Sequence, residues 1–203
     1  MLRIALLTLL LLLPLAPLRA EPPAEAIGRL NYAGYKASRH CTAFLTGARE
    51  AVTAAHCLER LQAGDLHLLL GYDKGAWREH LRPGSVEPAP DGRDLARICL
   101  KSPASAQSYP WSDTPPRRGE TLVVLGYGRP RIHAQSRRDC PVLAASAREV
   151  TLDCAVAPGT SGAPVLRRTE AGYEVVAVVS AARAGTAIAV RPPAEPAAES
   201  CGG

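Results

Sequence analysis

A serine that could act as a nucleophile lies between two glycines, in the sequence GTSG of residues 159–162. A serine hydroxyl becomes reactive when a base accepts its proton and when backbone N–H groups point at the oxyanion that forms. Gly159 permits the backbone conformations that aim such amides at one spot. An ordinary loop is the alternative interpretation of this turn. The sequence VTAAHC of residues 52–57 supplies His56, a candidate base far upstream of the turn.

A carboxylate is the third group that this chemistry needs, because it holds the imidazole in the required tautomer. Asp94 opens the sequence DLARI and is the stronger candidate. Asp91 is its rival, but no apolar strand start follows Asp91 directly. His56, Asp94 and Ser161 in this order therefore predict acyl transfer by a catalytic triad.

Short apolar runs separated by Gly and Pro must position these three residues, and most of the runs are rich in Val, Leu and Ile. Nine strands are expected, at residues 41–45, 51–53, 66–72, 95–100, 122–127, 149–154, 163–167, 173–181 and 186–190. Residues 58–63 and 144–148 are the helical candidates. Many short strands with turns between them predict an all-β protein.

The domain organisation is read from shifts in composition. Residues 1–20 combine Arg3, an apolar run and the small residue Ala20, which predicts a secretory signal peptide. An uncleaved anchor is the alternative, although the apolar run is too short for a stable membrane span. We expect an N-terminal β-barrel over residues 21–100 and a Pro-rich linker over 101–119. A C-terminal β-barrel and tail then follow over 120–203. The protein should be exported, either secreted or periplasmic.

Charge and cysteine content limit the other function classes. Lys and Arg exceed Asp and Glu by five over the whole chain, and no basic run or aromatic-interleaved patch indicates nucleic-acid binding. The chain has six cysteines and no Cys-x-x-Cys motif, so disulfides are expected rather than a metal site. Six cysteines allow 15 pairings, which the sequence alone does not resolve. No cofactor is expected.

These motifs together resemble the chymotrypsin/trypsin-like serine proteases. The resemblance rests on CTAFL at 41–45, VTAAHC at 52–57, DLA at 94–96 and GTSGAPV at 159–165. The serine motif, with Cys154 seven positions before Ser161, is similar to the short exported bacterial branch that includes the glutamyl endopeptidases. The resemblance implies two six-stranded antiparallel β-barrels, with the active site in the cleft between them.

The resemblance also implies a role for each motif residue. Ser161 is the nucleophile, His56 is the general base and then the general acid, and Asp94 orients His56. The N–H groups of Gly159 and Ser161 would form the oxyanion hole. Thr160 stands where the digestive branch has an aspartate that pairs with a new N-terminus. We therefore expect an enzyme that does not depend on that zymogen switch.

The substrate-binding residues implied by the resemblance lie in two segments of the second half. They are Ala155, Val156, Ser180 and Ala182. Ala155, Val156, Ala182 and also Val179, which precedes Ser180, indicate an apolar, shallow pocket. Arg183 could instead supply a charge that selects an acidic side chain. The sequence does not decide between these two specificities.

Family resemblance further implies a disulfide between Cys41 and Cys57, which bracket His56. We expect a second between Cys140 and Cys154, bracing the segment before the serine turn. The third, between Cys99 and Cys201, would strap the tail across the first lobe as in some family members. A buried free thiol at Cys99 is the alternative.

The sequence thus predicts an exported, monomeric serine endopeptidase that acts on protein or peptide substrates. A catalytically weak pseudo-protease that binds a partner through the same fold is the alternative. An esterase-like or self-processing hydrolase would use the same acyl chemistry.

Overall fold

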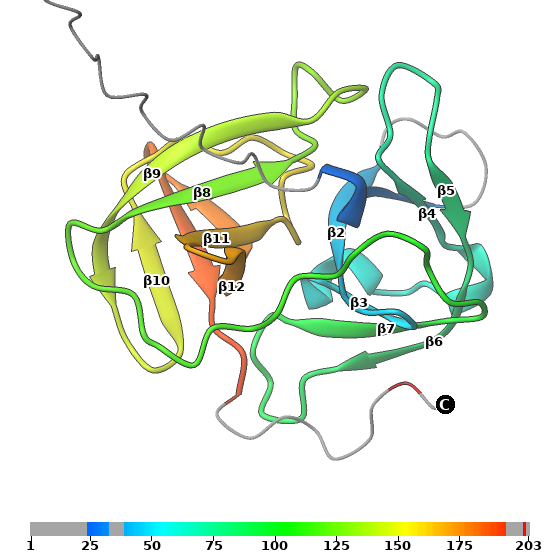
Figure 1. Ribbon diagram of the computed structural model, residues 1–203, viewed down its shortest axis with the longest axis horizontal. Coiled ribbons are helices and arrows are strands. Elements are labelled where there is room, and N and C mark those ends of the chain that lie inside the picture. Colours follow the sequence, from blue (N-terminus) through cyan, green and yellow to red (C-terminus); the bar gives the residue numbers. More distant parts are fainter. Residues whose placement is uncertain (1–23, 33–38, 194–200, 202–203) are drawn as a thin grey trace, which may run out of the picture.

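The computed structural model describes residues 24–32, 39–193 and 201, and it confirms an all-β protein with almost no helix. The strands form two β-structures that lie side by side, the first at right and the second at left in Figure 1. The only helical elements of the described residues are three 3-10 turns: η1 (Ala24–Ala26), η2 (Ala55–Leu58) and η3 (Ala63–Asp65). The predicted signal peptide lies outside the described residues.

The first lobe is a seven-stranded antiparallel sheet with the order β5-β4-β1-β2-β3-β7-β6. Its strands are β1 (Ile27–Asn31), β2 (His40–Gly47), β3 (Glu50–Thr53), β4 (His67–Leu70), β5 (Glu79–Leu81), β6 (Pro83–Pro88) and β7 (Ala96–Leu100). The prediction of a closed six-stranded barrel needs correction here, because this sheet is a half-barrel with two edges. Only Arg82 separates β5 from β6, yet β5 pairs with β4 and β6 pairs with β7. The chain itself, rather than a hydrogen-bonded ladder, joins the two edges.

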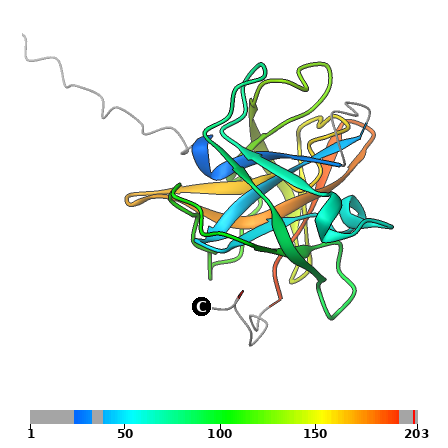
Figure 2. The ribbon, with the colours of Figure 1, turned by 90° about the vertical axis from the view of Figure 1, so that its right-hand side faces the viewer.

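The second lobe is a closed barrel with the strand order β10-β13-β12-β11-β8-β9, which confirms the prediction of a six-stranded barrel for this half. Its strands are β8 (Thr121–Gly126), β9 (Ser136–Ala145), β10 (Glu149–Leu152), β11 (Pro164–Thr169), β12 (Gly172–Arg183) and β13 (Thr186–Val190). Figure 2 views the molecule from the side of the first lobe.

Both helical candidates are wrong. The segment 144–148 carries the end of β9 and the turn into β10, where Ala144 pairs with Thr151 and Ala145 with Val150. The backbone groups of the two alanines are used by the sheet ladder, and this overrides their helix propensity. The segment 58–63 lies mostly between the 3-10 turns η2 and η3.

Strand β8 shows how one apolar run serves two cores. Leu122 and Val124 point into the core of the second barrel, whereas Val123 and Leu125 belong to the core of the first lobe. Successive side chains of a strand point to opposite faces, so this strand is buried on both sides. The first core therefore continues onto the outside of the barrel, and the two lobes are joined by apolar packing.

Two further features hold the fold together: the segment that connects the lobes, and three disulfides. In the segment 101–119, the amide of Tyr109 donates to Leu45 O and the amide of Ser112 donates to Val175 O, so this segment is held to both lobes. The disulfides are the three expected pairs: Cys41–Cys57, Cys99–Cys201 and Cys140–Cys154. Within the described residues, no helix has the length and hydropathy needed to span a membrane.

Candidate active site

The structure brings His56 and Asp94 together through two hydrogen bonds. His56 lies in η2, and Asp94 lies two residues before β7. The backbone amide of His56 donates to Asp94 Oδ1 at 2.8 Å, and His56 Nδ1 lies 2.8 Å from Asp94 Oδ2. Ser180, near the end of β12, donates its hydroxyl to the same Oδ2. The carboxylate is thereby held by three donors, and it fixes the imidazole through Nδ1.

These hydrogen bonds shift the pKa values of both Asp94 and His56. Burial disfavours the charged form of Asp94, but the hydrogen bonds from His56 and Ser180 outweigh it and lower the pKa of Asp94 to about 2. The hydrogen bond to Asp94 raises the pKa of His56 above its ordinary value, against the opposing effect of burial. Asp94 is therefore a carboxylate at neutral pH, and it stabilises the protonated form of His56.

The serine turn needs its glycines for steric reasons. Gly162 has a φ of +83°, and a Cβ there would lie 2.1 Å from Thr42 O and 2.2 Å from Thr53 Oγ1. Gly159 has a φ of +102°, and a Cβ there would lie 2.2 Å from His40 Nε2. The turn is thus pressed against the first lobe at both ends, where only glycine fits.

The amides of the serine turn differ in their hydrogen bonding. The amide of Thr160 donates to Ala157 O at 3.0 Å, and that of Gly162 donates to Val179 O at 2.7 Å. Within the described residues, the amides of Gly159 and Ser161 have no acceptor. An oxyanion site requires free donors that point at the oxyanion, and these two amides are candidates for that role.

Ser161 and His56 line one cavity of about 260 Å³ between the lobes. Among the described residues, no hydrogen bond joins the hydroxyl of Ser161 to His56, and His56 Nε2 lies 3.8 Å from Cys57 Sγ. Hydrogen bonds between a nucleophile and its base are often long without substrate and tighten in the complex.

Asp91, the rival carboxylate, is used elsewhere. Its Oδ2 lies 2.5 Å from Arg93 Nη2 and 3.3 Å from Arg148 Nη1 of the second lobe. Arg93 also donates to Arg191 O, one residue after β13. Asp91 therefore ties the segment that carries Asp94 to the second barrel. Arg148 and Arg191 are far from this segment in the sequence, so no local pattern indicated them.

The four predicted substrate-binding residues do not line the cavity of Ser161. Ala155 and Ala182 are exposed, while Val156 and Ser180 are half-buried. Of the four, Ser180 contacts Asp94. Their role in holding a substrate stays a prediction.

Sequence reasoning missed Thr42, a fully buried residue of β2. Its hydroxyl donates to Gly159 O at 3.0 Å and accepts from the amide of Tyr127 at 2.9 Å. Its carbonyl accepts from Thr53 Oγ1 at 2.8 Å. The one signal in the sequence was a polar residue inside an otherwise apolar strand, and buried polar groups are normally hydrogen-bonded.

A metal-like grouping also lies at this site. The ligand atoms of Cys41, His56 and Cys57 are all within 4.8 Å of one another. The two sulfurs form a disulfide, so they are not the thiolates that bind metal ions. This grouping therefore does not suit a metal.

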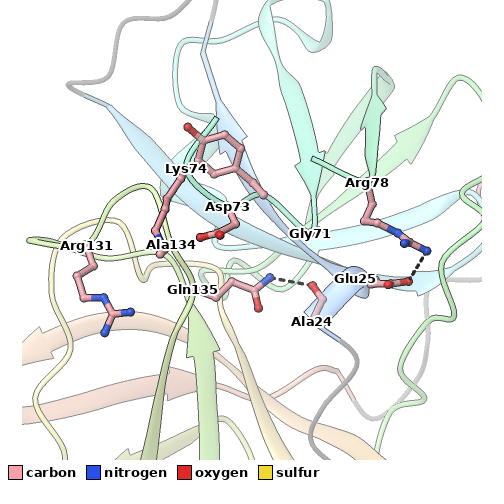
Figure 3. A pocket seen from close by; sticks show the side chains of 10 residues that line it. Ala24, Glu25, Gly71, Asp73, Lys74, Arg78, Arg131, Ala134 and Gln135 are labelled. Atoms are coloured by element: carbon pink, nitrogen blue, oxygen red, sulfur yellow. Dashed lines mark hydrogen bonds and ion pairs between the residues drawn. The ribbon is translucent and has the colours of Figure 1, made fainter. Parts of the chain in front are cut away.

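A larger cavity of about 440 Å³ lies away from these residues. Figure 3 shows Arg78 pointing toward Glu25 at 3.2 Å and Gln135 toward the carbonyl of Ala24 at 2.8 Å. Those contacts hold the N-terminal segment to loops of both lobes. None of the candidate catalytic residues lines this cavity.

Comparisons with known proteins found one matching family model and similar solved structures. The family model described as a trypsin-like peptidase domain matches residues 41–178, a range that includes His56, Asp94 and Ser161. Among solved structures, the chain is similar to the VesB protease of Vibrio cholerae, with a TM-score of 0.68 and 18% sequence identity. The match covers 82% of this chain and 60% of the Vibrio protein, so this chain spans less than two thirds of that protease. That likeness shows the fold. No curated protein sequence matches the chain.

Proposed function

The chain belongs to the trypsin-like peptidase family and carries its serine peptidase domain, and we propose that it is an exported serine endopeptidase. Its catalytic residues are Ser161, His56 and Asp94. The amides of Gly159 and Ser161 form the oxyanion hole. Protein or peptide chains are the substrates.

The proposed reaction follows from the roles of these groups. Ser161 Oγ attacks the scissile carbonyl while His56 Nε2 accepts the hydroxyl proton, and the developing oxyanion is held by the two free amides. The C–N bond then breaks as the imidazolium returns its proton to the leaving amine. Water, deprotonated by His56, releases the acyl group and restores Ser161. Asp94 stays ionised throughout and stabilises the imidazolium.

One observation carries the proposal: the hydrogen bond of 2.8 Å between His56 Nδ1 and Asp94 Oδ2, in a site whose cavity His56 shares with Ser161. A base whose other nitrogen is held by a carboxylate is the arrangement that activates a serine. The raised pKa of His56 supports the same assignment, since a stronger base accepts the serine proton more readily.

Export and a monomeric state are part of the proposal. Three disulfides fit an oxidising compartment outside the cytosol. Determination of the N-terminus of the protein recovered from culture medium or periplasm tests the signal peptide. Light scattering of the purified protein tests the monomer.

The decisive experiment is covalent labelling with a serine-reactive phosphonate ester, followed by mapping of the modified peptide by mass spectrometry. The adduct is expected on Ser161, and Ser161→Ala is expected to lose both labelling and hydrolysis, the latter by about 10⁶ in kcat. Circular dichroism of the variant serves as the folding control. A folded protein whose Ser161 resists the probe is a binding protein instead. Hydrolysis of esters without hydrolysis of peptides would identify the esterase-like alternative.

A further inference from the structure

The cavity that contains Ser161 has walls from both lobes. Tyr32, Arg39 and His40 come from the first lobe, and Arg129 and Pro158 come from the second. The residues predicted to hold the acyl part of a substrate, Ala155, Val156, Ser180 and Ala182, are all absent from this lining. The attacked carbonyl sits at Ser161 and the acyl part is expected at those other residues, so this cavity is left for the leaving group.

We propose that this cavity selects substrates with a carboxylate on the leaving group, within the first two residues after the scissile bond. The carboxylate is either an acidic side chain or the free C-terminus of a short leaving peptide. This inference rests on the proposed function, because it names the substrate class of the same site.

The charged side chains that line the cavity are arginines. Arg39 and Arg129 are exposed at the cavity, and its described lining includes no Asp or Glu. Within the described residues, neither guanidinium has a carboxylate partner. Guanidinium groups bind carboxylates through paired N–H donors, and two unpaired ones favour an anion over a neutral or cationic side chain.

Two observations tie these arginines to the segments around the proposed catalytic residues. The guanidinium carbon of Arg39 lies 5.7 Å from the ring centre of Tyr32, and the Tyr32 hydroxyl donates to Cys57 O at 2.6 Å, next to His56. On the opposite wall, the backbone amide of Arg129 donates to Pro158 O at 3.1 Å, in the loop that leads to Ser161. Each arginine is thus tied to a segment that carries a proposed catalytic residue.

A buried charge behind the wall adds to the positive potential. Arg29 is only 5% exposed, and its Nε and Nη2 have no hydrogen-bond partner. Burial, followed by the charges of Arg29 and Arg129, lowers the pKa of His40 to about 4. His40 is therefore neutral at pH 7, because burial and the nearby positive charges disfavour its protonated form. The field of these charges acts through a poorly screened interior, where charges interact more strongly than in water.

The expected preference is moderate, because Arg39 and Arg129 are exposed and screened by salt. Exposed ion pairs change equilibria by small factors, so two of them predict about three- to tenfold higher kcat/KM for the acidic substrate at low salt. The preference should shrink at high ionic strength.

The test compares peptides that share one acyl side. Fluorogenic peptides carry Asp or Asn, and Glu or Gln, at the first or second position after the scissile bond. A second set has alanine at both positions and ends at the second one, with either a free or an amidated C-terminus. We expect faster cleavage of the acidic member in at least one set, and the set that responds identifies the source of the carboxylate. Equal rates within both sets would overturn the inference.

Matched variants assign the preference to the cavity. Arg129→Gln and Arg39→Gln should each reduce the ratio of acidic to neutral kcat/KM. Arg131→Gln removes an equal charge from the wall of the other cavity, and it should leave the ratio unchanged. A ratio that is the same in all three variants and the wild type argues against the assignment.

Binding of leaving-group peptides keeps the inference testable without turnover. The protein is titrated at low salt into two labelled tetrapeptides. Both have a free amino end and a fluorophore on a C-terminal lysine, and they differ only in having Asp or Asn as the first residue. Tighter binding of the Asp peptide, lost in Arg129→Gln, supports the cavity's preference even if no peptide is hydrolysed. Equal dissociation constants rule out an acidic side chain at the first position as the source of the carboxylate, whereas failure of the proposed function is seen separately as absent labelling of Ser161.

Discussion

The backbone amide of Thr42 donates to the carbonyl of Ser161 at 2.9 Å. Thr42 belongs to the first lobe and Ser161 to the second, so the first lobe holds the backbone of the proposed nucleophile directly. The Thr42 hydroxyl extends this contact to Gly159 O and to the amide of Tyr127. One buried residue therefore sets how the serine turn sits against the lobe that carries His56 and Asp94.

Replacement of Thr42 tests this link. Thr42→Val keeps the shape but leaves Gly159 O and the Tyr127 amide without partners, at a cost of about 1–3 kcal/mol in the free energy of unfolding. We also expect a lower kcat, because Gly159 is no longer held. Thr42→Ser keeps the hydroxyl and should retain more activity than the valine variant. Thermal unfolding and kcat measure both effects, and equal losses in the two variants would disprove the role of the hydroxyl.

The pH profile follows from the pKa of His56. Only neutral imidazole accepts the proton of Ser161, so kcat/KM should rise with pH and level off above the pKa of His56. Asp94 raises this pKa above its ordinary value of 6.5, so the midpoint should lie above pH 6.5. A profile that is flat from pH 5 to 8, with the chemical step rate-limiting, is incompatible with His56 as the base.

The variant Asp94→Asn serves as the control for that profile. Loss of the carboxylate removes the main cause of the raised pKa, so the midpoint should move to lower pH. The rate should fall by about 10⁴, because the imidazole is no longer held in the correct tautomer. An unchanged midpoint would show that Asp94 does not set the pKa of His56.

Activity should not require trimming of the N-terminus at Ile27. Ile27 is fully buried inside β1, where it pairs with Phe44, and its carbonyl accepts from the amide of Gly71. Thr160 has no carboxylate with which a new amino group could pair. Mass spectrometry of the active species should therefore find residues before Ile27 still attached. An inactive protein that gains activity only on cleavage at Ile27 would refute this expectation.

The long-range disulfide should contribute more stability than a short-range one. Cys99–Cys201 spans 102 positions and Cys140–Cys154 spans 14. The chain-entropy model assigns loops of these lengths about 4.7 and about 3 kcal/mol. Thermal unfolding of the two double Cys→Ala variants provides the comparison. A larger loss of stability in the Cys140→Ala/Cys154→Ala variant would contradict the entropic order.

Much of the fold class was readable from residue types. Apolar runs such as Leu122–Tyr127 predicted strands that the structure contains, because a strand buried on both faces is apolar along its length. The strands that sequence reasoning missed are β1, β5, β6 and β9. In β9, most residues other than Cys140 and Val142 are exposed, and β6 begins and ends with proline. Such strands are held by ladder hydrogen bonds to their neighbours, which leave little trace in residue type.

The candidate site, like the fold, could be predicted from the sequence only in part. The residue types and order of His56, Asp94 and Ser161 were legible in the sequence, since the chemistry restricts which side chains can do it. Glycine at 159 and 162 was legible too, but the close approach of His40 and Thr42 that demands it was not. The roles of Thr42 and Arg148, the half-barrel of the first lobe and the positive cavity beside Ser161 were decided by tertiary structure alone. Each joins residues far apart in the chain, and local sequence patterns carry information only about neighbouring residues and their burial.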